Sequence, residues 1–250
     1  MFESIPNIII ASGGKICYAV VINNCKGADH MQITFLGHSC FLISDGSYRI
    51  LTDPYISGDP LCPVSADRVE ADYIFVTHGH HDHVGDTAAI AKRCGSTVCC
   101  TADLASAVFA ASGVKTQIGN LGGTMPTAFG SAKLFQALHG GGAEGVPASG
   151  FIFNIGGKKI YHAGDTALMS DMALLADEGI DLALLPIGDL FTMGPDDALR
   201  AVKLIRPKLV VPMHYDTFPG IAQDAGAFAA DVRAAGFDAK VLRPGDSLSL

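Results

Sequence analysis

The most informative stretch of the sequence is YIFVTHGHHDHVGD, residues 73–86, in which an apolar run leads into four histidines and an aspartate. The apolar residues predict a strand, and side chains two positions apart at its end point the same way. His78 and His80 can therefore bind one metal ion. If the chain then turns into a helix, Asp82 and His83 reach the opposite side of the same pocket. Imidazole nitrogens and carboxylate oxygens suit zinc and similar divalent ions.

Chance does not explain this motif. With nine histidines and 21 aspartates in 250 residues, the pattern His-x-His-x-Asp-His should arise roughly 0.001 times. Solvated loop histidines without a function are the alternative, and this estimate disfavours them. One short motif cannot close a hydrolytic site by itself, so further ligands are expected downstream.

Three single residues downstream are candidates for those ligands. His139, Asp165 and His214 each follow an apolar, strand-like run, at the place where side chains of different strands converge. Each also has an ordinary explanation, because Asp often caps helices and a lone His can be a hydrogen-bonded core residue. Together with the histidine motif, however, they predict one metal centre.

Apolar periodicity predicts an α/β fold with two strand-rich halves. The strand-like runs cover residues 31–37, 40–44, 48–54, 73–78, 96–100, 114–119, 132–138, 150–155, 158–164, 181–187, 208–214 and 239–245. The helical stretches cover residues 86–93, 102–111, 168–178, 196–205 and 223–235. Each half can bury one sheet face against the other sheet and the opposite face under helices, which predicts a four-layer αββα sandwich.

The first 30 residues differ from the rest of the chain. Residues 1–30 have an acidic start, a break at Gly13-Gly14-Lys15 and no small-residue cleavage site, so we do not expect a signal peptide. They are either an added N-terminal strand or arm, or the product of an upstream start codon with the domain opening at Met31, and we favour the second. A single domain is expected over residues 31–250.

The composition excludes several classes of protein. Hydrophobic residues make up 49% of the chain and charged residues 17%, which excludes disorder over most of it. A net charge of −8 without basic blocks argues against nucleic acid as a partner. No run reaches the roughly 18 apolar residues that a membrane span needs. Seven cysteines without a Cys-x-x-Cys pair predict reduced thiols and a cytoplasmic location.

Five segments together resemble a known family. They are LGHSCFLI (36–43), LTDP (51–54), VTHGHHDHVGD (76–86), IYHAGDT (160–166) and VPMHYDTFP (211–219). They resemble the metallo-β-lactamase superfamily, and within it a family of bacterial and archaeal metal-dependent hydrolases of unassigned substrate, relatives of the phosphorylated-ascorbate lactonase. The resemblance covers about residues 31–250 and implies the metallo-β-lactamase-like αββα fold.

The resemblance also implies two divalent ions held by seven side chains. It places one ion on His78, His80 and His139 and the second on Asp82, His83 and His214, with Asp165 bridging both. Zinc is favoured, and manganese or another divalent ion also suits such ligands. The loop after His139 departs from the family, whose members tend to have Ser where this chain has Gly140-Gly141-Gly142. Substrate contacts from that loop are therefore in doubt.

The mechanism follows from the charge of the ions. Two divalent ions about 3.5–4 Å apart lower the pKa of a shared water towards 7, so hydroxide forms without a side-chain base. Asp82 is expected to orient that hydroxide as well as bind metal. Asp53 is expected to accept an N–H from a ligand histidine, or else to form a plain Asp-Pro turn. His38 is expected at the pocket mouth as a substrate binder or proton donor, or else as a structural turn residue. We expect His162 to lie beneath the site and His81 to face solvent or the layer behind the ligands.

The predicted function is metal-dependent hydrolysis of a small ester, lactone or phosphodiester, with the homo-oligomeric state left open. A non-catalytic metal-binding or scaffold protein on the same fold is the alternative, although it would normally have lost a ligand. A redox di-iron enzyme would want a carboxylate where His80 stands. A nuclease would usually carry a large extra domain between Asp165 and His214, and a β-lactamase would be exported.

Overall fold

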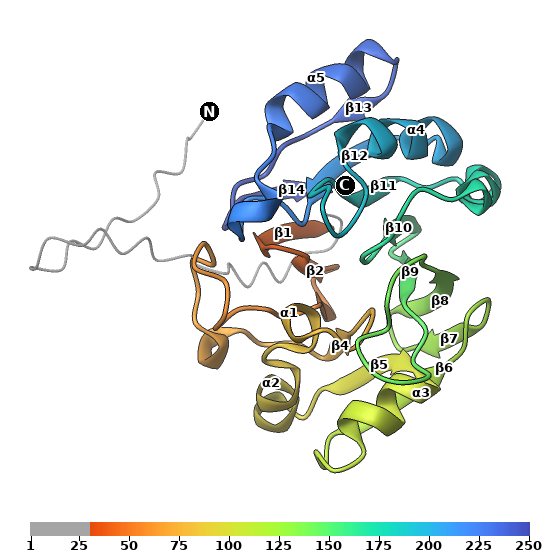
Figure 1. Cartoon of the computed structure of the whole chain (residues 1–250). Helices are drawn as coiled ribbons and strands as arrows, with labels where there is room; N and C mark the ends of the chain where they lie inside the picture. Colours follow the sequence, from red (N-terminus) through yellow and green to blue (C-terminus); the bar gives the residue numbers. More distant parts are fainter. Residues whose placement is uncertain (1–30) are drawn as a thin grey trace, which may run out of the picture.

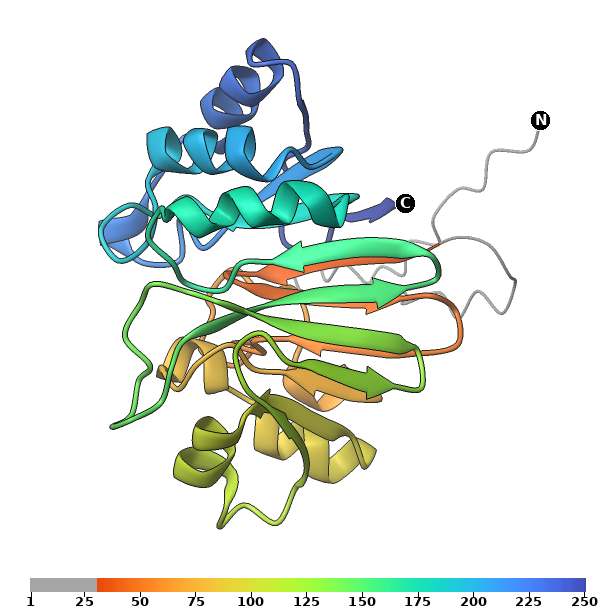
Figure 2. The same cartoon turned by 90° about the vertical axis from the view of Figure 1, so that its right-hand side faces the viewer.

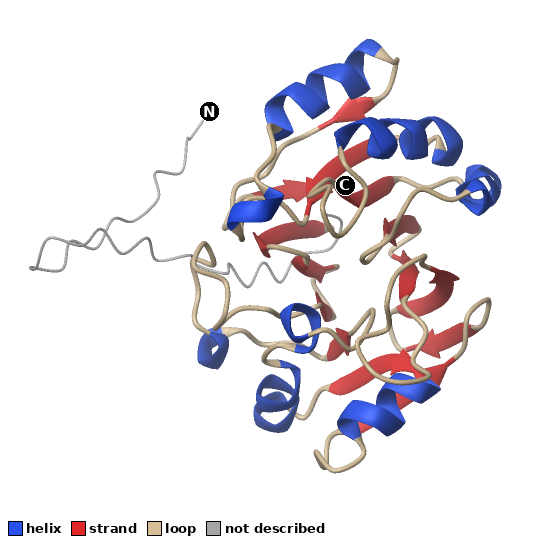
Figure 3. Cartoon of the chain, viewed as in Figure 1, coloured by secondary structure: helices blue, strands red, loops and turns tan. Residues whose placement is uncertain are grey.

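The computed structural model describes residues 31–250, and the predicted extension over residues 1–30 lies outside them. Two seven-stranded sheets face each other, and helices cover the outer side of each sheet, as Figures 1 and 2 show in two views. Coloured by secondary structure, the strands form the middle of the molecule and the helices its two outer layers (Figure 3). The predicted αββα sandwich is therefore confirmed.

The first sheet starts as an antiparallel meander and ends as a parallel array. Its spatial order is β14-β1-β2-β3-β4-β5-β6, with parallel pairing from β3 to β6. The strands are β1 (Gln32–Gly37), β2 (Cys40–Ser44), β3 (Arg49–Thr52), β4 (Tyr73–Phe75), β5 (Thr97–Thr101), β6 (Lys115–Gly119) and β14 (Ser247–Ser249). The helical segments of this half are η1 (Ala66–Arg68), α1 (His81–Val84), α2 (Thr87–Cys94), α3 (Ala102–Leu104) and its continuation η2 (Ala105–Phe109).

The second sheet repeats this plan. Its spatial order is β13-β12-β11-β10-β9-β8-β7, with parallel pairing from β10 to β13. The strands are β7 (Thr124–Thr127), β8 (Gly130–Gln136), β9 (Ser149–Ile155), β10 (Lys158–His162), β11 (Leu182–Pro186), β12 (Leu209–Met213) and β13 (Asp238–Ala239). Its helical segments are η3 (Ser170–Glu178), α4 (Pro195–Ile205), η4 (Pro219–Ile221) and α5 (Ala225–Ala234).

Alternation along the strands of the first sheet produces two apolar layers. Ile50 and Phe75 belong to the core between the sheets, whereas their neighbours Leu51 and Ile74 pack in the layer under the helices of the first half. All four side chains are fully buried. Because successive strand residues point to opposite faces, a strand buried on both sides reads as a continuous apolar run.

The loops at one edge of the sandwich carry the predicted site residues. Asp53 follows β3, His78 follows β4, His139 lies beyond β8, Asp165 lies beyond β10 and His214 follows β12. All of these positions lie past the carboxyl ends of their strands. In sheets with parallel strands this is the edge at which ligands bind, so the fold brings the candidates to one place.

Two predicted elements differ from the structure. Residues 239–245 do not form the expected strand: β13 ends at Ala239, and the last strand is β14, in which Leu248 pairs with Ile33 of β1. Within the failed run Val241 is 37% exposed while Leu242 is buried, so its side chains do not all face a core. The helix expected at 168–178 is the tighter 3₁₀ segment η3. No helix among residues 31–250 could cross a bilayer.

Candidate metal centre

Three histidine side chains converge on one point. The Nε2 atom of His78 lies 2.9 Å from Nδ1 of His80, which in turn lies 3.3 Å from Nε2 of His139. The candidate ligand atoms of all three lie within 4.8 Å of one another. The tight Gly79 turn at the end of β4 brings the first two together, and the loop after β8 brings the third. The spacing of the ligand atoms suits one divalent ion.

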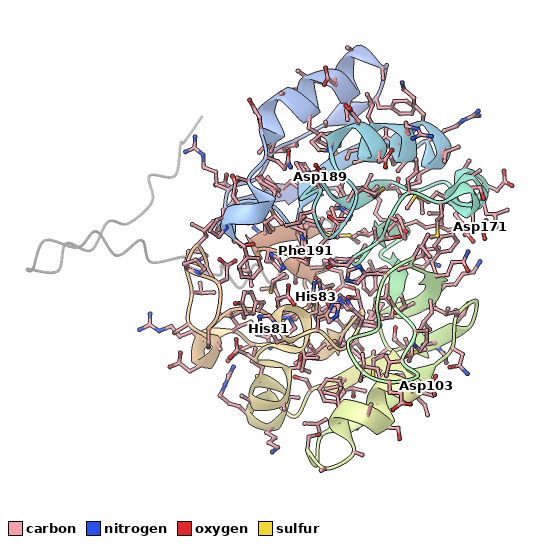
Figure 4. The ribbon with its side chains drawn as sticks, in the orientation of Figure 1. His81, His83, Asp103, Asp171, Asp189 and Phe191 are labelled. Carbon is pink, nitrogen blue, oxygen red and sulfur yellow. The ribbon has the colours of Figure 1, made fainter. Side chains whose placement is uncertain are left out.

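A second group of ligand atoms lies beside the first. Asp82, His83 and His214, together with His38, place one ligand atom each within 4.8 Å of one another. Helix α1 turns Asp82 and His83 into the pocket, where His83 Nε2 lies 4.0 Å from Asp82 Oδ2. Residues of the His78–His83 motif therefore meet His214, which follows β12 of the opposite sheet. Figure 4 labels His83 at the centre of this region of the molecule.

Asp165 lies between the two groups. Its Oδ2 atom is 3.0 Å from His214 Nε2 and 3.6 Å from His139 Nε2, and its Oδ1 atom is 3.3 Å from His83 Nε2. The carboxylate is 97% buried, since only 3% of its side chain is accessible. One oxygen faces His83 of the motif and the other faces two single ligands from the second half. This is the placement that a bridging ligand needs.

Several polar atoms of the cluster lack a hydrogen-bond partner among the described residues. They are His83 Nε2, Asp165 Oδ1 and His214 Nε2, all buried. Leaving buried polar atoms unpaired costs about 1–3 kcal/mol each, so native proteins rarely do it without a functional reason. A cation bound by the lone pairs of these atoms would remove this energetic cost. The donor set therefore fits divalent metal.

The electrostatics of the cluster also favour a cation. Burial holds the pKa of His78 at about 2, with help from the charge of His83, so the His78 ring is neutral at pH 7. Burial acts to lower the pKa of His83, but the Asp165 and Asp53 carboxylates raise it well above its usual value. Burial acts to raise the pKa of Asp165, and the His83 and His214 rings reverse this and hold it well below its usual value. The two carboxylates thus stabilise positive charge between them.

Asp53 and Thr77 orient the candidate ligands His83 and His78 by hydrogen bonds to Nδ1, on the side of each ring away from the site. Asp53 Oδ2 accepts hydrogen bonds from His83 Nδ1 and Thr77 Oγ1, each at 2.8 Å, and Asp53 Oδ1 accepts from the Thr77 backbone N–H at 2.8 Å. Because the Thr77 hydroxyl gives its only proton to Asp53, its oxygen must accept from His78 Nδ1, 3.0 Å away. Both histidines therefore donate an Nδ1–H to a partner behind them and turn Nε2 towards the site. Asp53 sits where the sequence expected a hydrogen-bond acceptor, and Thr77 was missed because its type carries no metal signal.

His38 lies in the turn after β1 and is buried, because only 1% of it is accessible. Its Nε2 atom lies 3.2 Å from Asp82 Oδ2, and a 2.6 Å hydrogen bond joins its Nδ1 atom to Thr217 Oγ1. Burial lowers the pKa of His38 to about 4. The backbone carbonyl of His38 also accepts from the N–H of His214 at 2.8 Å, which ties the two sheets together at the site. The segment that follows β12 thus covers the turn after β1, and the role of His38 as a substrate binder or proton donor stays a prediction.

His38, Asp53 and His214 share an unusual backbone conformation. Their φ angles are 50°, 37° and 56°, in the left-handed region that non-glycine residues rarely adopt. Such strain persists where surrounding contacts impose it, and it concentrates at functional sites.

The two remaining histidines of the motif segments lie as expected. The side chain of His81 is 80% exposed, and its Nδ1 atom is 3.7 Å from Asp82 Oδ1. His162 is fully buried beneath the cluster, where its Nε2–H donates to the Ser39 carbonyl at 2.9 Å and its Nδ1 accepts from the Gly164 N–H at 3.2 Å. His162 thereby fastens β10 to the turn that carries His38.

The glycine-rich loop after His139 packs on the motif backbone. The carbonyl of Gly141 accepts from the N–H of Gly79 at 2.8 Å. Gly142 has φ +76°, and a Cβ there would lie 2.3 Å from backbone atoms of Gly79 and His80. A Cβ on Gly140 would lie no closer than 3.8 Å to His80, so Ser would fit at that position. The glycines at 141 and 142 are thus needed for backbone contact.

Comparisons with known proteins agree with this fold and site. Residues 32–214 match the model of the β-lactamase superfamily domain. The UPF0173 metal-dependent hydrolase of Symbiobacterium thermophilum is 54% identical over 225 residues, which cover 88% of this chain and 100% of that protein. The Thermus thermophilus protein of the same name is 47% identical over 224 residues, which cover 88% and 99% of the two chains.

A solved structure leads to the same conclusion. Igni18, a metallo hydrolase from the hyperthermophilic archaeon Ignicoccus hospitalis, superposes with a TM-score of 0.83 at 33% sequence identity, and covers 89% of this chain and 99% of its own. It is described as a metallo hydrolase, as the sequence relatives are described as metal-dependent hydrolases. The chain belongs to the UPF0173 metal-dependent hydrolases of the β-lactamase superfamily.

Proposed function

We propose that this metal-dependent hydrolase uses two divalent ions, with zinc favoured and manganese also suitable, on a small ester, lactone or phosphodiester. The observation that carries the proposal is the convergence of seven side chains into two adjoining groups that share Asp165. One ion would be held by His78, His80 and His139 and the other by Asp82, His83 and His214. The relatives are described as metal-dependent hydrolases, which supports hydrolysis with a metal.

The ions would supply Lewis acidity to the substrate oxygen and lower the pKa of a water between them towards 7. The protein supplies orientation. The negative charge of Asp165 lies between the two groups of candidate ligand atoms and would stabilise a cation in either group. Asp82, 14% exposed and held by His38 at 3.2 Å, is placed to accept a hydrogen bond from the attacking water. Asp53 and Thr77 keep the ligand atoms of His78 and His83 aimed at the same space.

Metal content tests this proposal directly. We expect elemental analysis of purified protein, loaded with zinc or manganese, to give close to two ions per chain. His139→Ala should lose metal because it removes one of three convergent nitrogens, whereas the exposed neighbour His81→Ala should keep the wild-type stoichiometry. A wild-type content near zero after metal addition would instead support the scaffold alternative.

A further inference from the structure

Two of the exposed apolar side chains of this protein lie in a loop beside the candidate metal centre. Leu190 and Phe191, in the loop between β11 and α4, are 65% and 59% exposed. Tyr55 and Phe218 are partly buried, and their rings lie 5.7 and 5.4 Å from the ring of His38. We call these four residues the apolar strip. Large exposed apolar side chains that adjoin one another mark interaction sites on otherwise polar surfaces.

Contacts of the 188–193 loop attach the strip to the site. A Cβ on Gly188 would lie 2.4 Å from the carbonyl oxygen of His214, and the Met193 N–H donates to the carbonyl of Thr166, next to Asp165, at 2.9 Å. The loop is therefore held at both ends by neighbours of candidate ligands. Figure 4 labels both Phe191 and His83 near the middle of the view, whereas Asp103 and Asp171 lie at the periphery.

The rings of Tyr55 and Phe218 are connected to the loop that carries Leu190 and Phe191. The rings of Tyr55 and Phe218 are 6.1 Å apart. A Cβ on Gly220, two residues after Phe218, would lie 3.0 Å from Leu190 Cδ2. The strip thus begins against His38, which contacts Asp82, and runs outward to Leu190 and Phe191. Tyr55 and Phe218 thus lie against His38 of the candidate metal centre, and Leu190 and Phe191 are exposed to solvent.

No Lys or Arg among residues 31–250 forms an ion pair with the carboxylates of this centre. Within residues 31–250 every ion pair of Asp53, Asp82 and Asp165 is with a histidine. The cation among the residues that line the cavity of about 150 Å³ on the Thr217 side of His38 is Arg243. Arg and Lys are the usual partners of phosphoryl oxygens. Apart from the ions, the site therefore has no paired Lys or Arg that would bind a charged phosphate ester more tightly than a neutral carbonyl ester.

We propose that the substrate is an uncharged carboxylic ester or lactone whose apolar acyl chain lies along the apolar strip. This inference rests on the proposed hydrolytic function and narrows its substrate class. Water adds to the acyl carbon, the ester C–O bond breaks, and the proton from water passes to the departing alkoxide, which yields an acid and an alcohol. Burial of acyl methylenes against Leu190 and Phe191 then contributes to binding.

A panel of chromogenic substrates tests the proposal. For zinc-loaded wild type, kcat/KM should rise from 4-nitrophenyl acetate through butyrate to octanoate, and every ester should exceed bis(4-nitrophenyl) phosphate. Phe191→Ala and Leu190→Ala should lower the octanoate-to-acetate ratio about three- to tenfold, since they remove apolar contact area. Leu174→Ala is the matched control, because Leu174 is 64% exposed on η3 and the ratio should not change.

Binding of octanoate, measured by calorimetry, separates this inference from the proposed function. If no substrate is turned over but octanoate binds and Phe191→Ala weakens it, the acyl-binding strip stands and the hydrolytic function falls. Faster cleavage of the phosphodiester than of any ester would overturn the ester assignment. An octanoate-to-acetate ratio that is the same in wild type and in both strip variants would overturn the strip.

Discussion

The two halves of the molecule build their shares of the site in different ways. The first half supplies His78, His80, Asp82 and His83 from six consecutive positions, with Asp53 and Thr77 holding them from behind. The second half supplies single residues from three separate strand ends. Three backbone hydrogen bonds join the halves at this edge: Gly79 to Gly141, Ser149 to Thr77, and His214 to His38.

The site residues of the first half are thus close together in the sequence, whereas those of the second half are brought together only by the fold. In the first half a short segment fixes the ligand directions, so its geometry depends little on the rest of the fold. In the second half each ligand position depends on the packing of a whole strand. The candidate bridging residue Asp165 belongs to the second half, and the hydrogen-bond network behind His78 and His83 belongs to the first. Substitutions in each can therefore be compared.

The largest expected effect follows from Asp165→Asn. The amide removes the charge that both ligand groups share, so it should weaken both ions and lower kcat/KM more than about 100-fold, since loss of an outer partner alone costs 10–100-fold. Ion content and hydrolysis of a chromogenic ester are the measurements. Asp171→Asn, on the exposed side of η3, is the control and should behave as wild type. Full activity in Asp165→Asn would rule out a bridging role.

Asp53→Asn should have a smaller effect, in the first half. Asn can still accept from Thr77 but lacks the charge that favours the His83 Nδ1–H, so metal affinity should fall about 10–100-fold. A competition titration with a chelating indicator measures this. Asp72→Asn is the control, because Asp72 accepts a backbone N–H from Arg49 at the far end of the same sheet. An affinity loss as large as that of Asp165→Asn would mean that Asp53 is itself a ligand.

The same contrast explains what the sequence could predict. The His78–His83 motif was recognised because all its information is local, and the strands on either side were placed within one to three residues. The single residues His139, Asp165 and His214 could be named as candidates from strand ends, and the structure brings them together. Their roles as ligands stay a prediction.

Long-range contacts could not be predicted from local patterns. The burial of His38 depends on Thr217 and His214, which arrive from the other sheet. The strand β14 was missed because Ser247–Ser249 is short and polar and is strand only through its pairing with β1. The run at 239–245 looked more like a strand on its own, but its pairing with β12 ends at its start, where Ala239 pairs with Val210 and the Lys240 N–H donates to the Val210 carbonyl. Pairing partners decided both cases.

Gly142→Ala tests the contact between the halves. A Cβ at Gly142 would lie 2.3 Å from the backbone of Gly79 and His80, and φ is +76°. We expect the free energy of unfolding to fall by about 1–2 kcal/mol from the backbone conformation alone, with loss of the ion bound through His80. Gly140→Ser is the control, since a Cβ there makes only ordinary contact. Equal stability of the two variants, measured by urea denaturation, would show that the loop adapts freely.

The smallest expected effect concerns the far end of the second half. Glu178 of η3 accepts hydrogen bonds from Lys133 in the middle of β8 and Lys159 near the start of β10, each at 2.8 Å, so it ties together two strands whose carboxyl ends lead to His139 and Asp165. The hydrogen bonds from Lys133 and Lys159 hold the pKa of Glu178 below its usual value. Glu178→Gln should therefore cost about 0.5 kcal/mol at pH 7, because solvent screens this partly exposed group.

The pH dependence gives this prediction its sign. A carboxyl whose pKa is lowered by folding adds stability above its unfolded pKa of about 4.3, and this contribution is lost as the pH falls through the folded pKa. The difference between wild type and Glu178→Gln in urea denaturation should thus be present at pH 7, vanish in strong acid and shrink in 1 M salt. The exposed Glu144, which has no ion pair within residues 31–250, supplies the control Glu144→Gln. Metal content should be unchanged in Glu178→Gln, because apolar packing along β8 and β10 fixes their site ends. Metal loss there would mean that the second half depends on its ionic contacts as much as on its core.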